Sequence, residues 1–130
     1  MRVFLYIMAV TVTPTSSPLA AGIVVDTDSD ATGENDVRSG ATTVYIVDVD
    51  NSDNAAATYT KLYNSASPTI GTTAPDVILM TPASVRRAHV LGLQGVAFST
   101  GLSFASVTAG GTAGTTSPTS NVTVRILTST

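Results

Sequence analysis

The sequence contains no cysteine and no tryptophan, and it has only one lysine, one glutamate, one glutamine and one histidine. Without cysteine, neither disulfide bonds nor thiolate metal sites can form, and redox chemistry gives no information on the compartment. Charged residues make up 12% of the chain, against about 25% in typical soluble domains. The side chains that build catalytic centres are scarce, so we expect a protein that acts through its surfaces and not an enzyme.

Threonine, serine, alanine, valine and glycine dominate the 130 residues. β-branched residues fit a pleated sheet and lose side-chain freedom in a helix, and the strong helix formers are rare. A chain of this length forms one domain with one hydrophobic core. We therefore predict a single all-β domain, an antiparallel β-sandwich or jelly roll, with almost no helix.

Turn-forming residues divide the sequence into short apolar runs, which is typical of a sandwich. The residues with the clearest alternation are 44–49 and 122–127, where one side of each strand is expected to be wetter. Gly101 marks either a tight reversal or a bulge within one long strand. The runs predict about eight or nine strands over residues 2–13, 22–26, 42–48, 56–63, 77–80, 87–91, 95–100, 102–108 and 120–127.

Four polar segments between these runs are predicted to be loops. Residues 26–40 are acidic and rich in turn formers, residues 50–54 form a polar turn, and residues 64–75 are rich in proline, glycine and threonine. Residues 109–120 contain three glycines and no apolar side chain larger than alanine or proline. This Gly/Thr segment is expected to be a flexible loop.

The apolar run Val3–Val10 follows Arg2 and precedes Leu19, Ala20 and Ala21, which is also the order of a secretory signal. Eight apolar residues are too few to span a bilayer. We interpret residues 1–13 as an apolar N-terminal strand, buried on both faces, that pairs with a neighbouring subunit.

The low charge, together with a mean hydropathy of +0.31, would give a monomer a poorly soluble surface. Part of the surface is therefore expected to be covered by other chains. Charge is also uneven along the sequence: residues 1–53 carry eight of the nine acids and two arginines, a net charge of minus six, whereas residues 54–130 sum to plus three. The two halves could face different surroundings, or the acids could simply lie in solvated turns.

Asp26, Asp28 and Asp30 have the spacing of the first three ligands of an EF-hand loop. The rest of that motif is absent, because Ala31 replaces the turn glycine and Val37 replaces the bidentate glutamate. We expect a solvated acidic loop. The alternative is a loop-type cation site that Asp36 or Asp50 completes.

His89 follows Arg86 and Arg87, but no motif supplies a nucleophile or an orienting partner for it, so we predict a strand or interface histidine. Asn121 begins a formal glycosylation sequon whose occurrence is expected to be chance. The acidic chain lacks the basic stripe with interleaved aromatics that nucleic-acid binding requires. We therefore expect no catalytic residue, no cofactor, no resident metal, and neither nucleic acid nor membrane as a partner.

Three segments resemble small structural proteins of tailed bacteriophages. They are residues 59–64 (YTKLYN), residues 68–75 with PTIGT and Pro75, and residues 96–103 (VAFSTGLS), which in such proteins precede a Gly/Thr/Ala-rich loop and a final strand like NVTV at 121–124. The resemblance covers about half of the chain and none of residues 1–54. It implies a virion component with a β-sandwich or jelly-roll domain, and it assigns no functional residue.

The function expected from these observations is that of a capsid decoration or cement protein, which reinforces the shell by binding its outer surface. Its partners would be further copies of itself, in a homotrimer or larger cyclic oligomer, and the major capsid protein. The alternative is a tail, baseplate or fibre component that acts as an adaptor or contacts host glycans through Tyr59, Tyr63 and the turn at 50–54. A secreted adhesin-like domain would require cleavage of the N-terminal segment.

Overall fold

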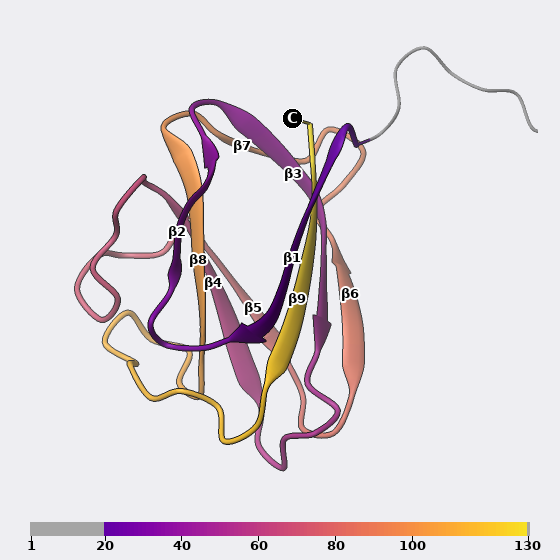
Figure 1. Ribbon diagram of the computed structural model, residues 1–130, viewed down its shortest axis with the longest axis vertical. Coiled ribbons are helices and arrows are strands. Elements are labelled where there is room, and N and C mark those ends of the chain that lie inside the picture. The colour runs from indigo at the N-terminus through magenta and orange to yellow at the C-terminus, as the bar shows by residue number, and fades with distance from the viewer. Residues whose placement is uncertain (1–19, 130) are drawn as a thin grey trace, which may run out of the picture.

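The computed structural model describes residues 20–129, which form nine β-strands and no helix, and therefore no helix that could cross a membrane. The strands lie in two antiparallel sheets that face one another (Figure 1). The predicted all-β sandwich is confirmed. The strands are β1 (Gly22–Ser29), β2 (Glu34–Ser39), β3 (Thr42–Asp50), β4 (Thr58–Asn64), β5 (Val77–Thr81), β6 (Arg86–Val90), β7 (Val96–Phe98), β8 (Gly101–Val107) and β9 (Val122–Thr128).

The strand order is that of a jelly roll. One sheet has the order β1-β9-β3-β6, with the short β7 also paired to β3, and the other has the order β2-β8-β4-β5. If β7 is set aside, the antiparallel pairs β1–β9, β2–β8, β3–β6 and β4–β5 are those of one long hairpin whose two arms carry four strands each. Rolling up such a hairpin sends successive strands to alternate sheets and produces the double-sheet jelly roll.

The core lies between the sheets and is built from one side of each strand. In β9 every second residue from Val122 to Ile126 is fully buried, as the alternation in the sequence predicts. β3 buries Val44, Val47 and Val49, and a bulge between Val44 and Ile46 changes the alternation. Each such side chain contributes roughly 1.5–3 kcal/mol on burial, so the core needs no covalent crosslink. Besides these residues of β3 and β9, its members are Leu62, Phe98, Leu102 and Phe104.

Two loops cover β8 and most of β4 on the side of the β2-β8-β4-β5 sheet that faces away from the core, as Figure 1 shows beside β8. All seven residues of β8 are buried, so both of its sides are covered. Ser103 donates a hydrogen bond from its hydroxyl to the carbonyl of Ser65 in the loop at 65–76. A Cβ at Gly71 of that loop would lie 2.5 Å from the Thr115 side chain, so it touches the loop at 109–120.

The prediction of one acidic loop over residues 26–40 is wrong. β1 continues to Ser29, and β2 occupies Glu34–Ser39. β2 pairs only with β8, through an irregular register in which Asp36 has a φ of 51°. An edge strand of this kind keeps most of its side chains in solvent, so its sequence is polar and lacks the composition of a strand.

The other described strands lie within a few residues of their predicted positions. The two possibilities at Gly101 are resolved in favour of a reversal, because β7 belongs to one sheet and β8, which begins at Gly101, belongs to the other. The strand predicted over residues 2–13 lies outside the described residues. The loop at 109–120 is held by hydrogen bonds at several points, including one from the Thr108 amide to the carbonyl of Thr116.

Candidate interaction surface

The outer face of the β1-β9-β3-β6 sheet carries a row of apolar side chains that runs across four strands. The strand register places Ile23 beside Leu127, Leu127 beside Ile46, and Ile46 beside Val90. Their neighbours along the strands, such as Ile126 and Val47, are in the core, so these four side chains point outward. Ile23 is 57% exposed and Val90 is 70% exposed, and Leu127 and Ile46 are half-buried. We call these four residues the apolar row.

Further apolar surface adjoins the apolar row. Val25, two residues after Ile23 on the same side of β1, is 52% exposed. Leu93, in the turn after Val90, is 87% exposed. At the β1 end, a shallow hollow is lined by Ala20, Ala21, Gly22, Ile23 and Leu127. Scattered apolar side chains are normal on protein surfaces, but a contiguous group of this kind marks a contact surface.

The turn that presents Leu93 depends on a glycine. Gly95 has a φ of 66°, which favours glycine, and a Cβ there would lie 2.5 Å from the carbonyl oxygen of Val44. The backbone of this turn can pack against β3 only because the side chain is missing.

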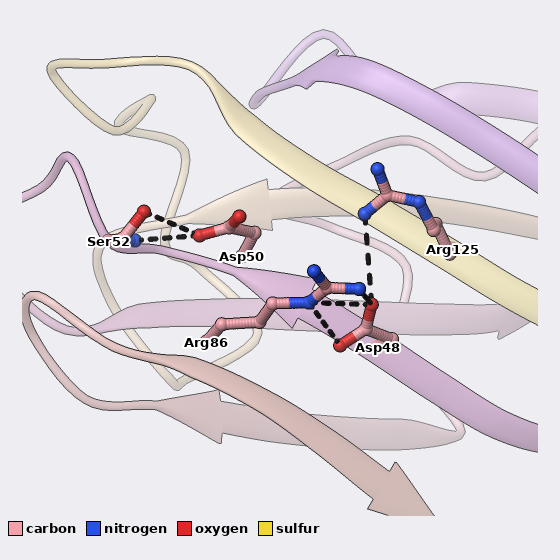
Figure 2. Close-up of polar contacts among 5 residues, drawn as sticks. All are labelled: Asp48, Asp50, Ser52, Arg86 and Arg125. Atoms are coloured by element: carbon pink, nitrogen blue, oxygen red, sulfur yellow. Dashed lines mark hydrogen bonds and ion pairs between the residues drawn. The ribbon is translucent and has the colours of Figure 1, made fainter.

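An ion-pair cluster lies beside the apolar row on the same face (Figure 2). Arg86 Nη2 lies 2.6 Å from Asp48 Oδ2, and Arg86 Nε lies 3.1 Å from Oδ1. Arg125 approaches from β9, with Nη1 3.7 Å from Asp48 Oδ2. The hydrogen bonds that Arg86 donates to the Asp48 carboxylate raise the pKa of Arg86. Farther along β3, Asp50 accepts hydrogen bonds from the hydroxyl and amide of Ser52, which lower the pKa of Asp50.

This cluster also joins residues from the acidic and the basic halves of the sequence. Asp48, from the acidic half, is neutralised by Arg86 and Arg125, both from the basic half. β1 and β3 of the first half lie in the same sheet as β6 and β9 of the second half. The two halves therefore do not form separate charged surfaces.

The structure does not bring the three candidate cation ligands together. Asp26 and Asp28 belong to β1, where Asp26 Oδ1 accepts a hydrogen bond from the Asp28 amide at 3.1 Å. Asp30 Oδ1 accepts one from the Thr32 amide at 2.7 Å and so caps a turn. Burial raises the pKa of Asp26. Within residues 20–129, no group of three or more histidine and acidic side chains is arranged to hold a metal ion.

His89 lies on β6, as predicted, and it connects the two sheets. Its Nε2 is 3.0 Å from the hydroxyl of Thr81 on β5, and Thr81 is fully buried. Burial of the ring, followed by the nearby charge of Arg87, lowers the pKa of His89. Because the Thr81 hydroxyl is inaccessible to a substrate, this pair is a structural contact and not a nucleophile with its base.

The residues considered for glycan binding are largely engaged within the domain. Tyr63 is fully buried, and Tyr59 is half-buried against Gly110. Asn51 donates from Nδ2 to the carbonyls of Ala56 and Pro82, and it accepts the Thr58 hydroxyl at 2.7 Å. Asn54 similarly bonds Thr119 and Ser120. These groups fasten loops together and present no aromatic platform for a sugar.

One polar group in the interior was not anticipated from the sequence. Lys61 is fully buried under the loop at 109–120, where its Nζ donates to the carbonyl oxygens of Gly111 at 2.5 Å and Gly114 at 3.1 Å. Burial lowers the pKa of Lys61. The sequence signal is slight: a lone lysine that shares one side of a strand with Tyr59 and Tyr63, and a glycine-rich segment that can approach it.

No family model matches the chain. No curated protein matches its sequence either. The class defined by the described residues is thus an all-β jelly roll with one loop-covered sheet and one sheet that exposes an apolar row.

Proposed function

We propose that the protein is a capsid decoration protein of a tailed bacteriophage, located in the virion, that binds the outer surface of the shell as a homotrimer or larger cyclic oligomer. The motifs that resemble phage structural proteins lie in β4, in the loop after it, across the β7–β8 crossing and at the start of β9. These motifs support the proposal as features of the strands and connections of the domain, and they contain no functional residue. Jelly rolls also recur in viral capsid proteins, which adds support by analogy of fold alone.

The apolar row is the observation that carries the proposal. In the other sheet, two loops of the same chain cover β8 and most of β4, whereas residues 20–129 supply no element that covers the apolar row. Association with another chain would remove these side chains from water, and a flat sheet face offers a broad contact to do so. A protein whose task is to assemble and to cover a shell needs such a surface and no chemistry.

Reinforcement would come from binding alone. The shell presents the same site many times, so weak contacts by each oligomer add up over the lattice. Each bound oligomer would hold neighbouring capsid subunits together against the outward pressure of packaged DNA. The partners under this proposal are other copies of the chain and the major capsid protein.

Cosedimentation with shells assembled from the major capsid protein of the same virus tests the proposal. We expect the wild-type protein to pellet with the shells and to saturate. The variant Ile23→Asp with Val90→Asp should bind shells about 100-fold more weakly or worse, because the oligomer that binds them would lose apolar contacts worth about 1.5–3 kcal/mol each.

A matched control is available on the other sheet. Ile78 and Met80 are 41% and 44% exposed on β5, so Ile78→Asp with Met80→Asp makes the same chemical change away from the apolar row. This variant should pellet like the wild type. Absence of wild-type binding to shells, or equal binding by both variants, would contradict the proposal.

A further inference from the structure

The apolar row is uncovered within residues 20–129, and the N-terminal sequence contains an apolar run that could cover it. Four side chains, from Ile23 to Val90, form an uncovered apolar strip, and Val25 and Leu93 extend it. The run Val3–Val10 contains no charged residue and is long enough to cross the strip. Three steps between adjacent strands amount to roughly 15 Å, and eight extended residues reach about 26 Å.

The N-terminal segment joins the domain at Ala20, next to one end of the apolar row. The described chain begins at Ala20, which with Ala21 and Gly22 lines the hollow at the β1 end of the apolar row. Nine residues, 11–19, separate this point from the run at 3–10, and nine extended residues span at most about 30 Å. The run can therefore reach either its own row or that of an adjacent copy.

Two prolines favour the adjacent copy. Pro14 and Pro18 disfavour helical backbone at the residues before them, Thr13 and Ser17, and favour extended backbone there. To fold back onto its own row, the chain would have to reverse within this stretch, immediately before β1. An extended connection instead carries the run away from its own domain, which is how exchanged segments join neighbouring subunits.

We propose that residues 3–10 of one copy cover the apolar row of a second copy, with the hollow beside Ile23 and Leu127 at one end of the contact. This deepens the assembly that the proposed function requires and rests on it. A direct pairing of two apolar rows is the less suitable arrangement, because it would leave the apolar run of both chains uncovered. An exchanged segment covers the run and the row in every subunit of a closed ring.

Crosslinking between single-cysteine chains tests the contact. The native sequence has no cysteine, so only the introduced thiols can react with the crosslinker. Ile7→Cys is placed in the centre of the run and Leu127→Cys in the centre of the row, on two chains of different mass that are refolded together. A short flexible bismaleimide is used so that the outcome does not depend on one register. We expect a crosslinked heterodimer between the Ile7→Cys and Leu127→Cys chains. It should be several-fold more abundant than the heterodimer formed when an Ile78→Cys chain replaces the Leu127→Cys chain.

A chain that carries both Ile7→Cys and Leu127→Cys shows which copy supplies the segment. If this chain forms only an internal link, and the mixed single variants form no heterodimer, the segment covers its own row and the proposal is overturned. No link in either format, or equal links to the Ile78→Cys control, would show that the run does not dock on the row at all.

The crosslinking experiment and the cosedimentation experiment can fail independently of one another. A strong heterodimer in a protein that does not pellet with shells would support segment exchange and contradict decoration. Pelleting without the crosslink would support decoration and contradict segment exchange.

Discussion

Replacing Lys61 by alanine should lower the free energy of unfolding by about 3 kcal/mol. The ammonium group donates to the carbonyls of Gly111 and Gly114 from beneath the loop at 109–120, so alanine removes both hydrogen bonds and leaves a cavity. Denaturant unfolding measures the loss. Hydrogen exchange should also become faster in the loop at 109–120, with little change at the outer face of β1. A change below about 0.5 kcal/mol would contradict this role for Lys61.

Lys61→Met is the matched control, because it fills most of the same volume without the charge. Its cost should be smaller than that of alanine, since methionine leaves little cavity and removes the unfavourable burial of the ammonium group. The loop at 109–120 should still loosen, because methionine offers no donor to the two carbonyls. Comparison of the two variants thus separates packing from hydrogen bonding.

The pH dependence of stability gives a second readout on the same residue. Burial lowers the pKa of Lys61 below its ordinary value of 10.5, so in the window between the folded pKa and 10.5 the unfolded chain binds a proton that the folded chain does not. Stability should therefore rise with pH across that window. Tyr63, whose pKa is raised by burial above 10.0, acts in the opposite direction only above about pH 10. The rise that Lys61 causes should be present in the wild type and absent in Lys61→Met.

Deleting residues 1–12 should convert the oligomer to a folded monomer that no longer binds shells. The hydrophobic core described between the two sheets is built from residues of β3, β4, β7, β8 and β9, so both sheets should still form. Assembly should be lost because apolar burial and backbone pairing carry most of its free energy. Light scattering gives the oligomeric state, and cosedimentation with shells gives the binding.

Arg86→Ala with Arg87→Ala is the comparison for this deletion. Both side chains are exposed, and Arg86 is already paired with Asp48 of its own chain. Exposed ion pairs contribute little and are screened by salt, so this variant should weaken shell binding modestly and mainly at low ionic strength. If the arginine variant instead disassembles the oligomer while the deletion does not, electrostatic docking dominates and the interface lies elsewhere.

Much of the fold could be predicted because most strands carry a local signal. β9 alternates buried and half-buried residues from Val122 to Thr128, and β8 combines apolar residues with small ones. β2 could not be predicted, because most side chains of this edge strand are solvent-exposed and its sequence is therefore polar. Its pairing with β8 is set by tertiary structure. Asp36, with its left-handed backbone conformation, reads in the sequence as part of a turn.

The candidate surface depends on information that no single segment contains. Ile46 shares the outer face with Val90 and Leu127 because of the bulge after Val44, and the sequence of β3 gives no clear sign of that bulge. Lys61 is buried because a loop about fifty residues later folds over it. Asp48 pairs with arginines from two distant strands. Composition predicted that some surface would be covered by another chain, but only the register identifies the apolar row as the candidate for that surface.

The copy number of the protein in purified particles tests the central claim most directly. Quantitative mass spectrometry of intact particles, calibrated against the major capsid protein, gives the ratio of the two chains. Decoration of the shell predicts hundreds of copies per particle, in a ratio fixed by the symmetry of the lattice. About a dozen copies or fewer would place the protein in the tail or baseplate and contradict decoration of the shell.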